Sequence, residues 1–190
     1  IRKLFFANRK SFAGILPGIL FAKRIIRETP EAEVTATVVC QAVQKVKKLE
    51  GLDPKAPVIV LGGKGFIGRR VVSMLSGDVY TVDIVHDNNQ NAWPNHLYGE
   101  KVVLVNISLK FVLDDYVSRL WPGLVVLNEV YPEPTPATVE KLASRGCSCY
   151  HVVGVSGRAV PYFPSAYQGG IPCCAAWLSE GIESLLLKLT

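Results

Sequence analysis

Short runs of apolar residues recur along this chain of 190 residues, and polar or amphipathic segments separate them. The runs are short and rich in valine, which is typical of strands buried on both faces of a sheet. They predict five strands, at Val58–Leu61, Val79–Val82, Lys101–Ser108, Leu124–Val130 and Cys149–Val155. Strands that alternate with helices indicate parallel pairing, so we expect an α/β fold with a doubly wound parallel sheet and helices on both faces.

Apolar residues at helical spacing predict a long helix before the first strand. Thr35 is a candidate cap for a helix over Ala36–Leu49, which Gly51 would end. The apolar face of this helix consists of Val38, Val39, Ala42, Val43 and Val46. Residues 28–33, which contain Pro30, are predicted to be a linker.

Three more helices are predicted further along the chain. Asp114 and Asp115 suit the start of a short helix that ends near Trp121, because acidic side chains interact favourably with the helix dipole. Thr135 and Pro136 fit the cap and first turn of a helix to Ser144, and residues 172–188 are predicted to form a final helix. Residues 86–99 are polar without a regular pattern, so the usual third strand is expected to be reduced or irregular.

A glycine-rich turn, Gly62-Gly63-Lys64-Gly65-Phe66-Ile67-Gly68, follows the first strand directly. Gly63, Gly65 and Gly68 fit the pattern G-x-G-x-x-G. In this pattern the first glycine allows a tight turn, the second lets the backbone approach a pyrophosphate, and the third lets the next helix pack closely on the sheet. The N–H groups at the start of that helix would face the phosphates.

The second strand ends in an acid, Asp83, which lies twenty positions after Gly63. A carboxylate there would accept hydrogen bonds from the two ribose hydroxyls of NAD, and it would repel the 2′-phosphate of NADP. Strand, turn, helix and acid together resemble the Rossmann dinucleotide-binding motif, which implies that residues 62–68 and Asp83 bind NAD rather than NADP. Two alternatives remain, a glycine-rich turn that binds no ligand and an S-adenosylmethionine site.

The order of elements over residues 35–190 resembles the cofactor domain of the amino-acid-dehydrogenase-like enzymes, the group of shikimate dehydrogenase and the methylene-tetrahydrofolate dehydrogenases. In that group two helices connect the cofactor domain to a substrate domain, and Ala36–Leu49 and Pro172–Leu189 resemble them. Val105–Ser108 resembles the segment along the nicotinamide nucleotide, which implies that Asn106 and Ser108 contact the cofactor. Residues 1–34 are then a basic arm or the remnant of a substrate domain, since they are too few to build that domain. The chain is therefore a fragment, or a partner supplies the missing wall of the cleft, or the fold is kept without the chemistry.

Polar residues also occur at the predicted ends of the later strands, where an open α/β sheet binds its ligands. They are Asn106, Ser108, Asn128, Glu129 and Tyr131. We expect them either to contact the substrate or nicotinamide, or to close the strand ends by hydrogen bonding. No catalytic residue is assigned from the sequence.

His151 lies inside the last predicted strand and is expected to be a hydrogen-bonded core residue. The residues that could suggest a metal site are Cys147, Cys149, His151, Cys173 and Cys174. Cys147, Cys149 and His151 would spread over roughly 13 Å of one strand face, too far for one tetrahedral ion, so no metal is expected. Cys173 near a helix start is a weaker candidate for a reactive thiol.

An aromatic loop could cover a nicotinamide or contact another subunit, and it contains Tyr162, Phe163, Pro164, Tyr167 and Gln168.

The net charge of +5 is concentrated at the N-terminus. Residues 1–50 hold ten Lys and Arg against four acids, and residues 1–27 hold seven bases and no acid among many apolar residues. A basic, apolar segment of this kind is typical of organelle-targeting peptides, of arms on anionic lipid or RNA, or of a helix whose bases face solvent. Pro17-Gly18 is expected to break or kink it. Any contact with nucleic acid or membrane is expected through residues 1–27 alone.

Five cysteines, an odd number, in a chain of this size favour a reducing compartment, mitochondrial or cytoplasmic, and not secretion. Because the chain begins with Ile1, we expect that something upstream is missing or cleaved.

The first functional hypothesis is an NAD-dependent oxidoreductase or its cofactor-binding half. The second is a non-catalytic Rossmann subunit, held by its arm in a homo-oligomer or in a larger assembly, such as a mitochondrial one. A methyltransferase is the third.

Overall fold

A computed structural model describes residues 16–83, 93–159 and 178–190, and its centre is a sheet of six strands. The strands are β1 (Val58–Leu61), β2 (Val79–Val82), β3 (Val103–Asn106), β4 (Val125–Asn128), β5 (Ser148–Ala159) and β6 (Leu178–Lys188). Their order is β2-β1-β3-β4-β5-β6, with β1 to β5 parallel and β6 antiparallel to β5. This Rossmann-like order confirms the predicted α/β class and all five predicted strands.

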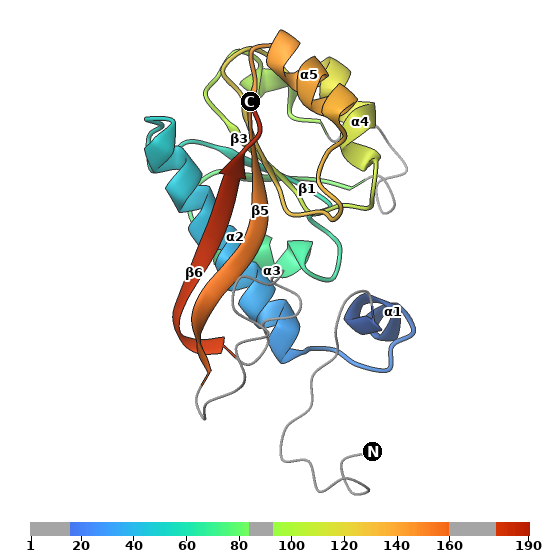
Figure 1. Ribbon diagram of the computed structural model, residues 1–190. Helices are drawn as coiled ribbons and strands as arrows, with labels where there is room; N and C mark the ends of the chain where they lie inside the picture. The colour runs from blue at the N-terminus through green and yellow to red at the C-terminus, as the bar shows by residue number, and fades with distance from the viewer. Residues whose placement is uncertain (1–15, 84–92, 160–177) are drawn as a thin grey trace, which may run out of the picture.

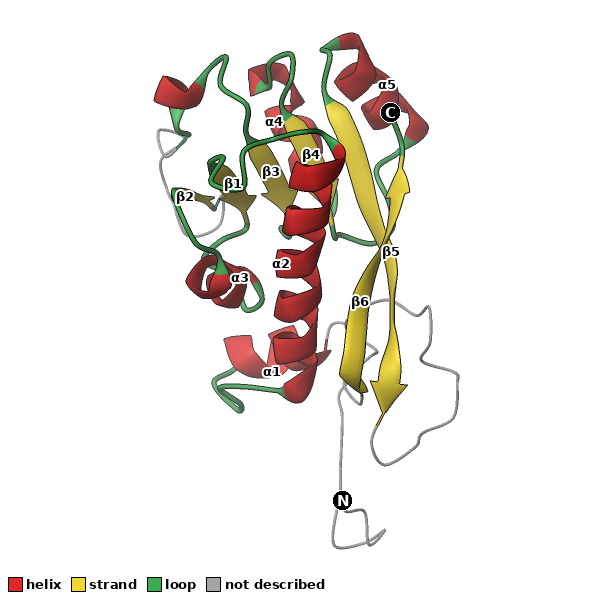
Figure 2. Cartoon of the chain, turned by 90° about the vertical axis from the view of Figure 1, so that its left-hand side faces the viewer, coloured by secondary structure: helices red, strands yellow, loops and turns green. Residues whose placement is uncertain are grey.

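Helices cover both faces of the sheet (Figures 1 and 2). The helices are α1 (Leu16–Ala22), α2 (Pro30–Leu49), α3 (Gly68–Met74), α4 (Val112–Tyr116) and α5 (Pro136–Ser144), with short 3-10 turns at Asn95–Leu97 and Val117–Arg119. Helix α2 crosses one face beside α3, and α4 and α5 lie on the other face (Figure 2). Among the described residues no strand lies between β2 and β3, and most of the segment predicted to be irregular, residues 84–92, lies outside the described part of the chain.

Alternate residues of each central strand enter two different cores, because successive strand side chains point to opposite faces. Val58 and Val60 of β1 join the core beneath α2 and α3, whereas Ile59 and Leu61 join the core beneath α4 and α5. The predicted apolar face of α2 is buried in the first core. Both cores are therefore built from the valine-rich strands that the sequence predicts.

Helix α2 begins six residues earlier than predicted. Its cap is Thr29, whose Oγ1 accepts a hydrogen bond of 3.2 Å from the N–H of Ala32, and Pro30 occupies the first turn. The prediction of a linker over 28–33 and a cap at Thr35 was therefore wrong. The physical reason is that proline is well suited to the first turn of a helix, where its missing N–H has no intrahelical partner to lose.

The predicted C-terminal helix is also wrong over its described part. Residues 178–188 form β6, which pairs with β5 and extends with it past the rest of the sheet (Figures 1 and 2). Register shifts near Gly157 and a positive φ of 57° at Gly181 let the two strands twist around each other. The connecting helix inferred by resemblance at Pro172–Leu189 is therefore wrong over residues 178–188, which form this strand.

Residues 1–15, 84–92 and 160–177 lie outside the described part of the chain, and with them the aromatic loop, Cys173 and Cys174. Pro17 and Gly18 lie in the first turn of α1, and the segment before this helix, on which the predicted break or kink depends, is outside the described residues. Of the helices described, none has the length and apolar character needed to cross a membrane.

Glu50, just after α2, joins three elements through its carboxylate. Tyr150 Oη and Lys188 Nζ donate hydrogen bonds to Oε1, the latter at 2.9 Å, and Ser148 Oγ donates to Oε2 at 3.1 Å. These bonds, that from Tyr150 above all, lower the pKa of Glu50 below its ordinary value. The end of α2 is thus tied to β5 and β6.

Replacing Glu50 by Gln should lower the free energy of unfolding by about 1–2 kcal/mol at pH 7, because the hydrogen bonds to the carboxylate lose their charge. A lowered pKa in the folded state stabilises the protein above the unfolded pKa of the carboxyl, and this contribution is lost as the pH falls through the folded value. The difference between wild type and Glu50→Gln in urea unfolding should therefore shrink below about pH 4.5. A difference that stays constant down to pH 3 would contradict this account.

Candidate functional site

The glycine-rich turn between β1 and α3 is a close backbone contact that excludes side chains. A Cβ on Gly68 would lie 2.0 Å from the carbonyl oxygen of Gly62, and one on Gly63 would lie 2.8 Å from Thr81 Cγ2. Gly62 has a φ of 89°, so the left-handed residue of the turn is Gly62, one position before the first glycine of the pattern. Gly68 opens α3 directly against the end of β1, as the pattern implies.

Asp83 follows β2 and faces this turn. Its side chain is 4% exposed, and its Oδ2 accepts a hydrogen bond of 3.2 Å from the backbone N–H of Lys64. Gly62 N–H also donates to the carbonyl of Val82, at 2.7 Å. The acid at the strand end and the glycine-rich turn, predicted as parts of one site, thus lie together.

Three backbone N–H groups of the turn make no hydrogen bond. Within the described residues, the N–H groups of Phe66, Ile67 and Gly68 have no hydrogen-bond acceptor, whereas the N–H of Gly65 donates to Gly62 O at 3.0 Å. No side chain caps α3. Successive free N–H groups beside a helix start favour an anionic ligand.

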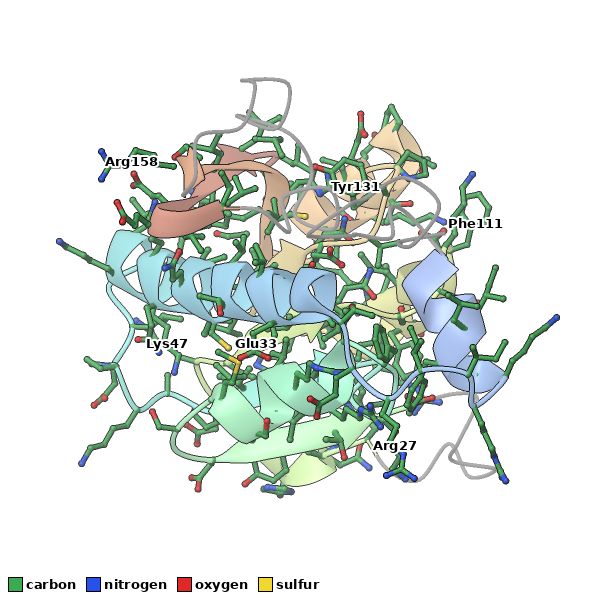
Figure 3. All side chains as sticks on the ribbon, turned by 90° about the horizontal axis from the view of Figure 1, so that it is seen from below. Arg27, Glu33, Lys47, Phe111, Tyr131 and Arg158 are labelled. Carbon is green, nitrogen blue, oxygen red and sulfur yellow. The ribbon has the colours of Figure 1, made fainter. Side chains whose placement is uncertain are left out.

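Helix α1 contacts the same turn from outside. The ring of Phe21 lies 4.9 Å from that of Phe66, and the guanidinium of Arg69 stacks 4.0 Å from the centroid of Phe21. Arg69 and Arg70 both donate hydrogen bonds to the carbonyl of Arg27, at 3.1 and 3.3 Å. Figure 3 shows α1 and the segment carrying Arg27 beside α2 and α3. The described part of the basic N-terminal segment is therefore anchored next to the glycine-rich turn.

A chain of side-chain hydrogen bonds crosses the carboxyl ends of β3, β4 and β5. Ser108 Oγ donates to Asn106 Oδ1 at 2.5 Å, and Asn106 Nδ2 donates to Asn128 Oδ1 at 2.7 Å. Asn128 Nδ2 lies 3.0 Å from His151 Nδ1 and donates to the carbonyl of Val130 at 2.8 Å. The structure thus brings together the strand-end residues predicted from the sequence, and it satisfies the two buried asparagines internally.

A pocket of about 190 Å³ opens beside this network, between the segments that lead into α4 and α5. It is lined by Asn106, Lys110, Phe111, Leu113, Asp114, Asn128, Val130, Pro132, Glu133, Pro134, Thr135 and Thr138. Thr138 Oγ1 donates to Asp114 Oδ1 at 2.6 Å, which joins the two helix starts. From sequence, Asp114 and Thr135 are recognisable only as helix signals, and the signal for this pocket is their position at two strand-to-helix junctions.

Glu129 and Tyr131 follow β4 with different surroundings. Tyr131, which is labelled in Figure 3, donates from its Oη to the carbonyl of Val152 at 2.6 Å, and its ring lies 4.8 Å from that of His151. Glu129 is partly buried, and burial raises the pKa of its carboxyl to about 8. No hydrogen-bond partner of this carboxyl occurs in the described structure.

His151 and the cysteines have core environments. His151 is 2% exposed, and burial lowers its pKa, against an opposing contribution from the backbone of Asn128. Burial raises the pKa of Cys147 to about 11 and of Cys149 to about 12, so both thiols stay protonated. Nowhere in the described ranges do three potential metal ligands come together.

Comparison with known proteins matches no family model and no curated protein. Among solved structures, the chain is similar to shikimate 5-dehydrogenase from Listeria monocytogenes in complex with shikimate and NAD, with a TM-score of 0.38 and 16% identity. The match covers 62% of this chain and 52% of that enzyme, so the chain spans about half the length of the protein it resembles. A likeness of this extent carries no argument about ligand or activity.

Proposed function

We propose that residues 35–190 form a dinucleotide-binding domain for NAD, and that the chain is an oxidoreductase or the cofactor-binding half of one. The observation that carries this proposal is the glycine-rich turn, in which unpaired N–H groups at 66–68 stand next to the buried carboxylate of Asp83. Backbone donors suit a diphosphate, and a carboxylate at this distance along the chain suits ribose hydroxyls.

The residues present fit a dinucleotide because the N–H groups of Phe66, Ile67 and Gly68 have no acceptor in the described structure, in the same turn whose Lys64 N–H donates to Asp83. Gly62, Gly63 and Gly68 allow this turn, since a Cβ at any of them would lie 2.0–2.8 Å from Ile107 O, Thr81 Cγ2 or Gly62 O. We assign residues 62–68 and Asp83 to the diphosphate and ribose, and Asn106 and Ser108 to the second nucleotide half. The nucleotide would supply hydride acceptance and donation, and the chain would bind and orient it.

Asp83 also carries the choice of NAD over NADP. A 2′-phosphate would meet a carboxylate that is already held in place by Lys64 N–H, and like charges at close range are unfavourable. S-adenosylmethionine would use the same strand-end acid, and a non-catalytic subunit would keep the same fold. The fold does not distinguish these two alternatives from an NAD-dependent enzyme. Ligand binding distinguishes an S-adenosylmethionine site, and turnover distinguishes a non-catalytic subunit.

Asp83→Asn should weaken NADH binding about tenfold or more, since hydrogen bonds to a charged acceptor are lost. The preference for NADH over NADPH should fall at the same time. Titration of intrinsic fluorescence with each nucleotide measures both effects. Asp78→Asn is the matched control, because Asp78 is an exposed acid at the opposite end of β2 and should leave both affinities unchanged.

The proposal is wrong if wild-type protein shows no change in fluorescence or melting temperature with millimolar NADH. Stabilisation by S-adenosylmethionine and not by NADH would favour the methyltransferase hypothesis instead.

Gly68→Ala should abolish NADH binding and lower stability by about 1–3 kcal/mol, because the new methyl group collides with the backbone of Gly62. Gly18→Ala is the control, since a Cβ there meets nothing within 4 Å. In α1 that change should be neutral or slightly stabilising. Thermal unfolding with and without NADH measures both, and a fully stable Gly68→Ala would contradict the close contact.

A further inference from the structure

Glu129 lies on the same edge of the sheet as the glycine-rich turn. Its backbone N–H donates to the carbonyl of Asn106 at 3.0 Å, and a Cβ on Gly62 would touch Ile107 O at 2.7 Å. Gly62, Ile107 and Glu129 are therefore successive neighbours across the ends of β1, β3 and β4. Two strand spacings, roughly 10 Å, separate the turn from Glu129.

The strand alternation places Glu129 opposite the pocket. Asn128 and Val130 line the pocket on the α4 and α5 side, and Glu129 between them does not. On the α2 side its neighbours in register are Ile107 and Val152, both packed in the core beneath α2 and α3. Helix α3 and the turn belong to that same side, because Val71 of α3 enters this core. Glu129 and the turn therefore lie on the same side of the sheet, at the carboxyl ends of the strands, where the turn would bind its ligand.

The carboxyl of Glu129 is a titratable group left over at this edge. The other polar groups near this edge make hydrogen bonds that do not involve Glu129. Asp83 accepts from Lys64 N–H, and His151 bonds to Asn128. Arg69 and Arg70 donate to the carbonyl of Arg27, and Tyr131 donates to the carbonyl of Val152. The α2 residues that enter the shared core are apolar, Thr35 of α2 is also buried at 1% exposed, and the acid Glu33 of α2 is exposed (labelled in Figure 3). Lys110 and Glu133 line the pocket on the other face. Burial is accordingly what sets the proton affinity of Glu129.

We propose that Glu129 is the acid–base group of this site, protonated when the site holds reduced nucleotide and ionised when it holds the oxidised one. This inference rests on the proposed function. An oxidised nicotinamide ring is positively charged and a reduced one is neutral, so a nearby carboxyl is ionised more easily beside the oxidised form.

The same carboxyl serves the oxidation of an alcohol. Glu129 would take the O–H proton of the alcohol, the electron pair of that O–H bond would form the second C–O bond, and a bound oxidised nucleotide would supply the acceptor for the C–H hydride. Glu129 would then be protonated beside a neutral ring, which is the state that desolvation of its carboxyl favours.

Nucleotide binding alone tests this inference. Dissociation constants of NAD⁺ and NADH, measured by fluorescence or calorimetry from about pH 6.5 to about pH 9, should show a preference for NAD⁺ that rises with pH. By linkage, the ratio changes about tenfold for each unit by which the Glu129 pKa differs between the two complexes. In Glu129→Gln the ratio should be independent of pH, whereas Glu140→Gln, at an exposed position of α5 outside the pocket, should behave as wild type.

The outcomes separate the two claims. If both nucleotides bind and the ratio is flat in wild type, or equally sloped in Glu129→Gln, the role of Glu129 is overturned and the nucleotide site stands. If neither nucleotide binds, the proposed function fails and the inference fails with it.

Unfolding without nucleotide provides a second measurement. A carboxyl whose pKa is about 8 when folded and 4.5 when unfolded reduces stability as the pH rises between these values, because the unfolded state loses its proton first. In Glu129→Gln the free energy of unfolding does not fall in this way, because the amide does not ionise. The stability of the variant relative to wild type should therefore increase from pH 5 to pH 8 and then level off. A difference that is constant with pH would show that Glu129 ionises normally and would overturn the proposal.

Discussion

The backbone contact between Gly62 and Gly68 is the constraint on which the candidate site depends. A strand that turns directly into a helix within seven residues brings two stretches of backbone together, and no Cβ fits between them. The contact fixes where α3 starts, and α3 then packs beside α2 over the first core. The N–H groups at 66–68, beside this contact, have no acceptor in the described structure. One steric requirement therefore sets both the start of α3 and the position of these N–H groups.

Strand alternation divides the polar edge of the sheet into two chemically different faces. Asn106 and Asn128 have the parity of Leu104 and Val126, so they meet on the α4 and α5 side and pair with each other. Such pairing is required there, since a buried amide without a partner costs about 1–3 kcal/mol. Glu129 has the opposite parity, lies between Ile107 and Val152, and has no such partner. A fully satisfied network and an unsatisfied carboxyl are thus adjacent in sequence but separated by the sheet.

The elements with strong local signals were predictable from sequence. Valine-rich runs predicted β1 to β5, and Thr135 with Pro136 predicted the start of α5, where Thr135 Oγ1 accepts from Thr138 N–H. The C-terminal segment was not, because Leu-Ser-Glu-Gly-Ile-Glu-Ser-Leu-Leu-Leu-Lys contains good helix formers whose strand conformation comes from pairing with β5. For the site, the turn and Asp83 were recognisable as one unit. The partners of Asn106, Asn128 and His151 required the strand register, which pattern alone does not supply.

The structure also changes the meaning of the basic N-terminal half. Lys45 donates to Glu183 and to the carbonyl of Ser184, and Lys47, 2% exposed, donates to the carbonyls of Pro54 and Ala56. The carbonyl of Arg27 accepts hydrogen bonds from the side chains of Arg69 and Arg70. Lys45 and Lys47 thus use their ammonium groups to hold α2 against β6 and against the loop before β1, and they offer no open surface to a polyanion. Lys48 is the one base of α2 in the exposed class, so the positive charge of residues 1–50 that is left for an anionic partner comes mainly from the seven bases of residues 1–27.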